Sequence, residues 1–405
     1  MILAYIISNT AMATLSVAAP MITVEYGCDN SDIGLLVTIG TALRVIPKFA
    51  TGFIVDQIGG KTLLIVSTFL LSIFTIAIPF YPTLWWMGVL WALVRVIQSL
   101  AWPSIVKIIA KTCPANEMGK IFSFMDVAFW CSLAFLQVVV TLSSDWKMLF
   151  YSSGVCGIIV CAATSILVTD SRFTRMRDST DTAKEFKEIS WKAIFSTTYS
   201  NPKFWCLAVY YGGMTIIRQG IWDWILLFLT QTTGCSVQYS VTIFTCLSFV
   251  GFISTLMFGV ISDRNTPARR DSVSLLFGIL LTVVLFLIAS LIPTGGGGSS
   301  GFHLYLTSAL LVLAGFFLLG PWGLPVGVMT VHFGGKQLCG TVSGTLDGLA
   351  TLASLSSGFV GAVSESPSGW QLVYVILTLI SALSTVALFL YMILDKRDVR
   401  KINQQ

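Results

Sequence analysis

Seven charged side chains lie within long apolar stretches of the sequence, where they could bind or exchange an ion. Four are cations and three are carboxylates: Arg44, Lys48, Arg95, Arg218, Asp126, Asp223 and Asp347. A charged side chain near the centre of a bilayer costs at least about 2.5 kcal/mol, so such residues usually line a cavity and have a function. The excess of positive over negative charge predicts a site for an anion.

Arg44 and Lys48 are four residues apart, so they share one face of a helix, where two cations repel each other unless an anion lies nearby. A substrate could supply that anion. A structural ion pair with Asp126 or Asp347, or a position at the membrane interface, are the alternatives. Arg218 suits anion binding because a planar guanidinium donates two parallel hydrogen bonds to phosphate or carboxylate oxygens.

Arg95 and Asp126 are candidates for coupling to protons. A buried carboxylate stays ionised beside a guanidinium and takes up a proton more readily when the guanidinium moves away. Movement of Arg95 onto a substrate would therefore load Asp126 with a proton, and the alternative is a static ion pair between neighbouring helices. Asp347 is a second proton-coupling candidate, and Asp223 is expected to hold a helix end.

The composition identifies lipid as the solvent around these residues. Of 405 residues, 55% are hydrophobic and only 11% are charged, less than half the roughly 25% of a globular domain. This excludes a soluble enzyme, a disordered protein and a nucleic-acid-binding protein. The nine cysteines are scattered without a CxxC pair, so no metal site is expected, and neither catalytic residues nor a cofactor are predicted.

Twelve runs of about 20 mostly apolar residues predict membrane-spanning helices, and their continuity excludes a β-barrel. They lie near 2–22, 33–53, 62–81, 84–108, 118–142, 148–168, 203–230, 238–261, 272–293, 303–330, 338–363 and 369–393. The first run is interpreted as a retained helix and not a signal peptide, although residues upstream of Met1 could be missing.

The distribution of basic residues predicts the orientation. Nineteen of the 24 Lys and Arg residues fall on the side of both termini and the even-to-odd loops, whereas the opposite side has only Lys147. The positive-inside rule places the first side, with both termini, in the cytoplasm, in a plasma or organelle membrane. The polar segment 169–201 is expected to be a cytoplasmic linker between an N-terminal bundle, 1–168, and a C-terminal bundle, 202–405, with a short tail.

Two short patterns each occur twice, and the two copies are separated by about half the chain length. Each has a glycine followed by an aspartate at fixed spacing: Gly52–Asp56 and Gly259–Asp263, then Gly119–Asp126 and Gly340–Asp347. The two offsets, 207 and 221 residues, are similar. They predict a duplicated six-helix unit whose halves are related by an axis along the membrane normal.

The stretch GFIVDQIGGK, from Gly52 to Lys61, resembles the loop 2–3 signature of the major facilitator superfamily. Arg95–Val96–Ile97–Gln98 resembles a second signature of that superfamily. The resemblance implies an all-α membrane protein with twelve transmembrane helices in two pseudo-symmetric six-helix bundles, which transports by alternating access. Several residues would then brace its conformations: Gly52, Asp56, Lys61, Gly259 and Asp263.

Within the superfamily the chain is most similar to the organophosphate:phosphate antiporters, which exchange glycerol phosphate or hexose phosphate for inorganic phosphate. The similarity is carried by the stretches 32–56, 98–103 and 201–224. It implies a substrate site with these residues: Lys48, Arg218, Gln98, Trp102 and Tyr5. Arg44 is added to this site from its spacing to Lys48, as a hypothesis that it supplies a second guanidinium. Three positions depart from that family, because its helix-one arginine falls at Ser8, its helix-five histidine at Phe129, and a tyrosine at Arg44.

Three functions follow from these observations. The first is exchange of a phosphorylated metabolite for phosphate by a protein that is expected to be a monomer in the lipid bilayer. The second is proton-coupled symport, or facilitated transport, of a carboxylate or zwitterion such as an organic acid or amino acid, which Arg95 and the two symmetric aspartates favour. The third is a membrane receptor that keeps the fold without transport.

Overall fold

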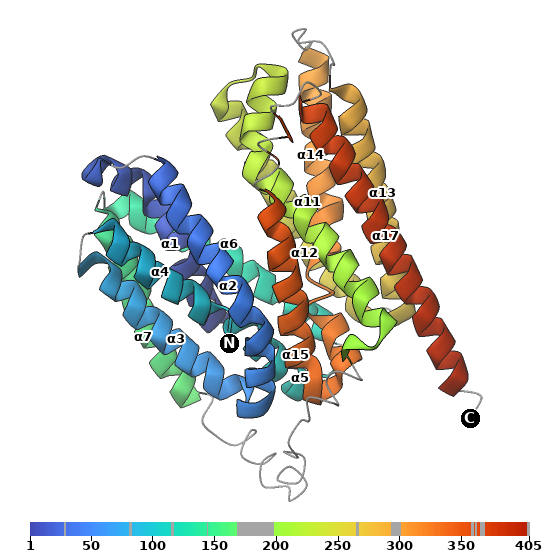
Figure 1. The fold of residues 1–405 in the computed structure, drawn as a ribbon, viewed down its shortest axis with the longest axis horizontal. Coiled ribbons are helices and arrows are strands. Elements are labelled where there is room, and N and C mark those ends of the chain that lie inside the picture. Colours follow the sequence, from blue (N-terminus) through green and yellow to red (C-terminus); the bar gives the residue numbers. More distant parts are fainter. Residues whose placement is uncertain are drawn as a thin grey trace, which may run out of the picture. The chain divides into compact units, whose positions relative to one another are not determined.

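The computed structural model describes residues 1–27, 30–80, 83–114, 117–143, 145–167, 198–264, 267–292, 301–357, 360, 363–364 and 369–402. Within these ranges every regular element is helical, so the expected all-α class is confirmed (Figure 1). The predicted linker 169–201 lies outside the described residues up to position 197.

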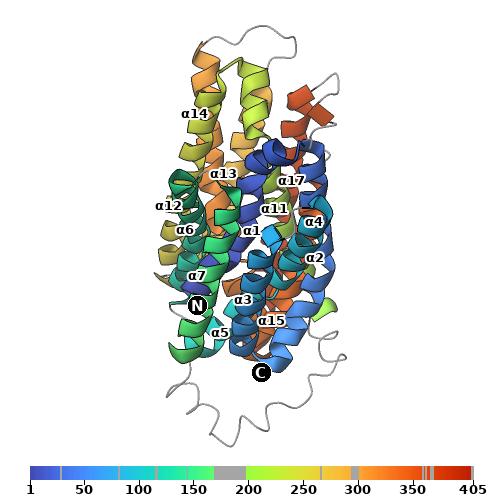
Figure 2. The ribbon, with the colours of Figure 1, turned by 90° about the vertical axis from the view of Figure 1, so that its left-hand side faces the viewer.

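The helices form two compact units, of which unit 1 contains 1–113, 124–198 and 330–348. Its helices are α1 (Ile2–Tyr26), α2 (Asn30–Ile58), α3 (Gly60–Ala77), α4 (Leu84–Gln98), α5 (Ala101–Thr112), most of α6 (Met118–Leu142) and α7 (Trp146–Leu167). A short 3₁₀ helix, η1 (Ile78–Phe80), follows α3. Helix α3 packs on α4, α5 and α7, and α2 packs on α4 (Figure 2). Trp91, Trp146 and Phe150 are buried in the core of this unit.

Unit 2 contains 114–123, 199–329 and 349–405. Its helices are α11 (Pro202–Thr233), α12 (Val237–Arg264), α13 (Pro267–Leu291), α14 (Gly301–Trp322) and α17 (Gly369–Ile402). Helix α17 packs on α11 and α13, and α12 packs on α14. Helix α15 (Val328–Ser354) contributes residues 330–348 to unit 1. Its first two residues and its last turns, with η3 (Leu355–Ser357), belong to unit 2. The division of the sequence into bundles 1–168 and 202–405 stays a prediction.

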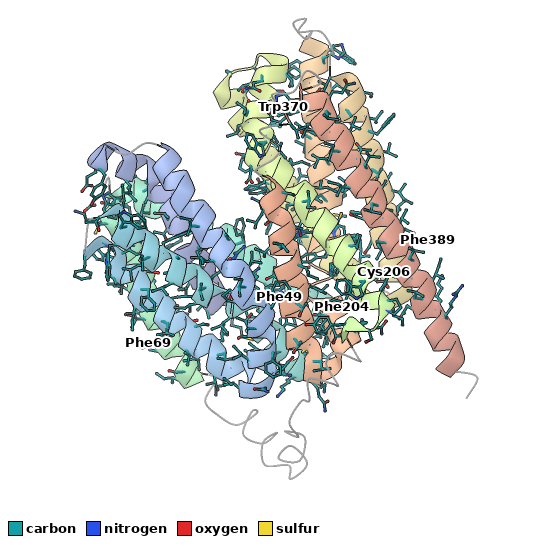
Figure 3. The ribbon with its side chains drawn as sticks, viewed as in Figure 1. Phe49, Phe69, Phe204, Cys206, Trp370 and Phe389 are labelled. Atoms are coloured by element: carbon teal, nitrogen blue, oxygen red, sulfur yellow. The ribbon has the colours of Figure 1, made fainter. Side chains whose placement is uncertain are left out.

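Eight spans in the described part of the chain are long and apolar enough to cross a membrane: α3, the α4–α5 pair, α6, α7, α12, α13, α14 and α17. Phe69 on α3 and Phe389 on α17 are about half exposed on the outer faces of their units, as expected for side chains that face lipid (Figure 3). The long helices α2, α11 and α15 are not among the eight, and these helices carry Lys48, Arg218 and Asp347.

The predicted run 84–108 is bent at its centre. Helix α4 ends at Gln98 and α5 begins at Ala101, and the amides of Ser99 and Leu100 donate to carbonyls three residues earlier. Pro103 explains the bend, because its ring lacks an N–H donor and clashes with the carbonyl of the preceding turn. The bend places Gln98 and Trp102 on either side of an irregular turn of backbone.

The predicted runs 303–330 and 338–363 are also interrupted. Helix α14 contains Pro321 and ends at Trp322, and a turn over 323–327 leads into α15. Helix α15 in turn has a break at Gly335, whose φ of 57° is a left-handed conformation that favours glycine. This break separates the first turns of α15 from the straight segment that carries Gly340 and Asp347.

Candidate functional site

The two cations of α2 contact different partners in unit 1. Arg44 Nη1 donates to Gln98 Oε1 at 3.2 Å, across the bend between α4 and α5. Lys48 Nζ forms an ion pair with Asp347 Oδ2 of α15 at 2.5 Å, and its side chain is only 7% exposed. A carboxylate of the protein itself therefore neutralises Lys48.

Arg95 completes a cluster of three cations around this ion pair. Its side chain is buried, and its guanidinium lies over the ring of Trp91, with Cζ 5.1 Å from the ring centroid. Arg44 and Arg95 both lie near enough to repel Lys48. The expected contact between Arg95 and Asp126 cannot be followed, because the side chain of Asp126 lies outside the described part of the chain. The described cluster, Arg44, Lys48, Arg95 and Asp347, has a net charge of +2 and can attract an anion.

Two aromatic residues that were assigned to the substrate site pack against each other in unit 1. The rings of Tyr5 on α1 and Trp102 on α5 are 5.4 Å apart between centroids. One turn along α1, Ser8 occupies the position of the antiporters' arginine. It is 1% exposed, and its hydroxyl has no hydrogen-bond partner among the described residues. The small hydroxyl leaves α1 without the charge that the family has there.

Arg218 lies near the middle of α11 in unit 2. Its guanidinium stacks over the indole of Trp322, with Cζ 4.5 Å from the ring centroid. Its Nη2 donates to Gln219 Oε1 at 3.3 Å, and Gln219 Nε2 donates to Asp223 Oδ1 at 2.7 Å. Asp223 thus bonds within the helix, ten residues before its end at Thr233, and does not take the helix-end position that was expected.

A second, fully buried ion pair lies near the C-terminal end of α2. Asp56 Oδ1 accepts a hydrogen bond from Lys107 Nζ of α5 at 2.6 Å, with side-chain exposures of 0% and 3%. Asp56 also accepts hydrogen bonds from the amide of Thr341 at 2.6 Å and from its hydroxyl at 2.7 Å. Lys107 donates to the carbonyl of Gln337 at 2.6 Å. Since Gln337 and Thr341 are four residues apart on α15, the ion pair bonds the carbonyl and the amide of a single helical turn.

Sequence reasoning missed Lys107. It lies inside the predicted run 84–108, between the buried residues Val106 and Ile108, but was counted with the cytoplasmic loops. The available signal was a lone lysine within apolar sequence, which is costly without a partner. Its partner Asp56 was already a candidate bracing residue, so an ion pair could have been considered.

The repeated glycines make matching close contacts in the two units. A Cβ at Gly52 would lie 2.3 Å from the carbonyl oxygen of Gly340, and a Cβ at Gly344 would lie 2.8 Å from the Cα of Gly52. In unit 2 a Cβ at Gly259 would lie 2.9 Å from the carbonyl oxygen of Gly119. Gly52 and Gly259 are one repeat pair, and Gly340 and Gly119 are another. Lys61 lies in the first turn of α3, and Asp263 is near the end of α12, but its side chain lies outside the described residues.

We expect Gly52→Ala to destabilise the protein by about 1–3 kcal/mol, because the added methyl group meets backbone that cannot move aside. Gly212→Ala in α11 is the matched control, since its Cβ would meet its nearest neighbour at 3.9 Å. Helix propensity alone should stabilise that control by up to about 1 kcal/mol. Thermal unfolding in detergent measures both; an equal effect of the two variants would contradict the close packing of α2 on α15.

Comparisons with known proteins agree with this architecture. Residues 1–358 match the Major Facilitator Superfamily. The structure of a bacterial homologue of the iron transporter ferroportin in its outward-facing state aligns with a TM-score of 0.72, at 12% identity, over 96% of this chain and 98% of that one. The predicted major facilitator fold is thereby confirmed.

Two curated relatives cover most of the chain. The membrane sensor protein UhpC of Escherichia coli K12 is 23% identical over 411 residues, which span 95% of this chain and 89% of that protein. The glycerol-3-phosphate transporter of Bacillus subtilis 168 is 24% identical over 341 residues, which span 79% and 74% respectively. This chain, a multi-pass integral membrane protein, therefore belongs to the Major Facilitator Superfamily.

Proposed function

We propose that the protein is a secondary transporter that moves a small organic anion by alternating access and exchanges a phosphorylated metabolite for phosphate. The observation that supports this most is the cluster of Arg44, Lys48 and Arg95 near the carboxylate of Asp347 among the described residues. A dianionic phosphate group would neutralise its net charge of +2. The similarity to a glycerol-3-phosphate transporter favours the same substrate class.

In the proposed mechanism Asp347 serves as the counterion of Lys48 when no substrate is bound. An arriving phosphate group competes with this carboxylate for the lysine. In unit 2, the planar guanidinium of Arg218 is suited to donate two parallel hydrogen bonds to an anion. Gln98 holds Arg44, while Tyr5 and Trp102 shape an aromatic wall. Asp347 offsets only one of the three positive charges, so release of the bound anion restores the net charge of +2 unless another anion takes its place, which favours exchange over leak.

The ion pair of Asp56 with Lys107, and the glycine contacts of Gly52 and Gly259, would stabilise one conformation of the cycle. They would do so by holding the C-terminal end of α2 against α15, through the contacts of Gly52, Asp56 and Lys107. We further propose that both termini are cytoplasmic and that the protein acts as a monomer with no catalytic activity.

Counterflow in proteoliposomes tests the proposed function. Vesicles are loaded with inorganic phosphate, and the entry of labelled glycerol phosphate and hexose phosphate is followed with a proton ionophore present. Phosphate-dependent, saturable entry is expected. The absence of entry in vesicles that hold folded protein would reject exchange. Uptake driven by a pH gradient alone, and lost in Asp126→Asn, would instead support proton-coupled transport of a carboxylate or zwitterion.

A membrane sensor is the second candidate, because a relative that covers 95% of this chain is a membrane sensor protein. A sensor needs an anion site but no turnover. It would be distinguished by a rise in the unfolding temperature with glycerol phosphate or hexose phosphate, as expected when a ligand binds the folded state, together with no counterflow of either compound.

We expect Asp347→Asn to lower the KM for phosphate about fivefold, which corresponds to the loss of about 1 kcal/mol of competition for Lys48. The maximal rate should fall as well, because no internal carboxylate helps to release the anion. Asp347→Glu keeps the charge and is the control. Initial rates of phosphate exchange over a concentration series give both constants. An unchanged KM with a lower unfolding temperature would show that the ion pair with Lys48 is only structural.

A further inference from the structure

The indole of Trp322, at the end of α14, is fixed by one face of α11. Tyr211, Thr215 and Arg218 are spaced i, i+4 and i+7 and therefore lie on the same side of that helix. Trp322 Nε1 donates to Thr215 Oγ1 at 3.2 Å, and the Thr215 hydroxyl donates to the carbonyl of Tyr211 at 2.8 Å. The tyrosine ring lies 5.7 Å from the indole. These contacts set both the position and the plane of the indole.

Arg218 uses this fixed indole as a platform. Its Cζ lies 4.5 Å from the indole centroid, well within the roughly 6 Å range of a cation–π interaction, which is strongest with tryptophan. Stacking involves the flat face of the guanidinium. The five N–H donors lie in its plane, so the stack is compatible with hydrogen bonds in that plane, such as the one from Nη2 to Gln219 Oε1.

The position of Trp322 in the fold makes the platform rigid. Pro321 precedes it in α14, and the turn that follows is closed by a hydrogen bond from the Leu324 amide to the Pro321 carbonyl at 3.2 Å. The helix therefore ends at the indole. Trp322 and Arg218 are both only partly buried, so the stack borders accessible space in unit 2.

We propose that Trp322 is a positioning residue for Arg218. Its indole sets the plane of the Arg218 guanidinium and thereby the affinity of the site for a phosphate group. This inference rests on the proposed role of Arg218 as an anion-binding residue. The break after α14 thereby gives the guanidinium of Arg218 a fixed support within unit 2.

Phosphate counterflow with Trp322→Leu and Trp322→Phe tests the proposal. Trp322→Leu removes the ring, and we expect the KM for phosphate to rise about 3- to 30-fold, the range of a partly buried cation–π contact. The maximal rate should stay within about twofold, because the loss concerns binding. Trp322→Phe retains a ring and should restore most of the affinity. In an Arg218→Lys background, Trp322→Leu should change the KM much less, because an ammonium group lacks the flat face that stacks.

Trp370→Leu is the matched control in the same unit. Trp370 lies at the start of α17 (Figure 3). Its indole also donates a hydrogen bond, to Gln231, and it contacts the rings of Trp224 and Phe228 in tilted and edge-on geometry. Its loss should lower stability without changing the KM. A wild-type KM in Trp322→Leu, or an equal rise in Trp370→Leu, would overturn the proposal.

A double-mutant cycle on thermal unfolding separates this inference from the proposed function. The variants are Trp322→Leu, Arg218→Ala and both together, measured without substrate. Residues in contact give non-additive losses, and non-additivity supports the stack even if wild-type vesicles exchange no phosphate. Additive losses would reject the stack, whatever the result of the transport assay.

Discussion

Arg218→Ala abolishes phosphate exchange while the protein remains folded: this is the largest effect that we expect from any single substitution. The guanidinium of Arg218 stacks on Trp322 near the middle of α11, and both its planar donor group and its position suit it to bind an anion. Arg218 is partly buried, and we expect a bound anion to enclose it further. Truncation of one partner of such a hydrogen-bonded charge pair costs about 2–5 kcal/mol, which is roughly 30- to 5,000-fold in affinity.

Lys203→Ala is the matched control for Arg218→Ala. Lys203 is a cation in the first turn of the same helix, and it forms an ion pair with Asp395 of α17 at 2.8 Å. This variant should keep the wild-type KM, with at most a small loss of stability. Initial rates of exchange, with the amount of folded protein measured by size-exclusion chromatography, decide the result. Substantial uptake by folded Arg218→Ala would remove Arg218 from the anion site.

The fold was predictable because a lipid environment allows few backbone structures. Lipid satisfies no backbone hydrogen bonds, so long apolar runs must be helices, and their number and the repeated Gly–Asp patterns identified the duplicated bundle. The close contacts of Gly52 with Gly340 and of Gly259 with Gly119 give these repeats a physical meaning: at each of them a glycine lets two helix backbones approach closely.

The partners of the buried charges were not predictable from spacing alone. Periodicity places Arg44 and Lys48 on one helix face, but the carboxylate of Asp347 that neutralises Lys48 is 299 residues away. Sequence reasoning left Asp126 and Asp347 as equal alternatives for this reason. The helix breaks at Pro103 and Pro321 were visible as prolines, yet the stack of Arg218 on Trp322 depends on how α11 packs against α14. The substrate-site roles of Gln98, Trp102 and Tyr5 stay predictions.

Lys107→Ala should be the most destabilising substitution of a charged residue in unit 1. It leaves the Asp56 carboxylate buried, with its side chain 0% exposed, and removes the ammonium group that neutralises it. Breaking a buried ion pair by removing one partner costs about 3–5 kcal/mol. Transport should fall with stability, because the carbonyl of Gln337 loses a donor and the end of α2 is held less firmly against α15.

The double variant Asp56→Asn/Lys107→Gln distinguishes a buried-charge effect from a simple loss of packing. Both side chains keep about their size, and an amide can still accept a hydrogen bond from the Thr341 amide and donate one to the Gln337 carbonyl. Because no charge is then left unpaired, the double variant should be more stable than Lys107→Ala and than either single amide variant, as measured by thermal unfolding in detergent. Transport by the double variant does not have to recover with its stability. A neutral contact between α2 and α15 separates more easily than an ionic one, so the equilibrium shifts away from the conformation in which these helices are in contact. A double variant less stable than both single variants would contradict the ion pair as the main interaction at this end of α2.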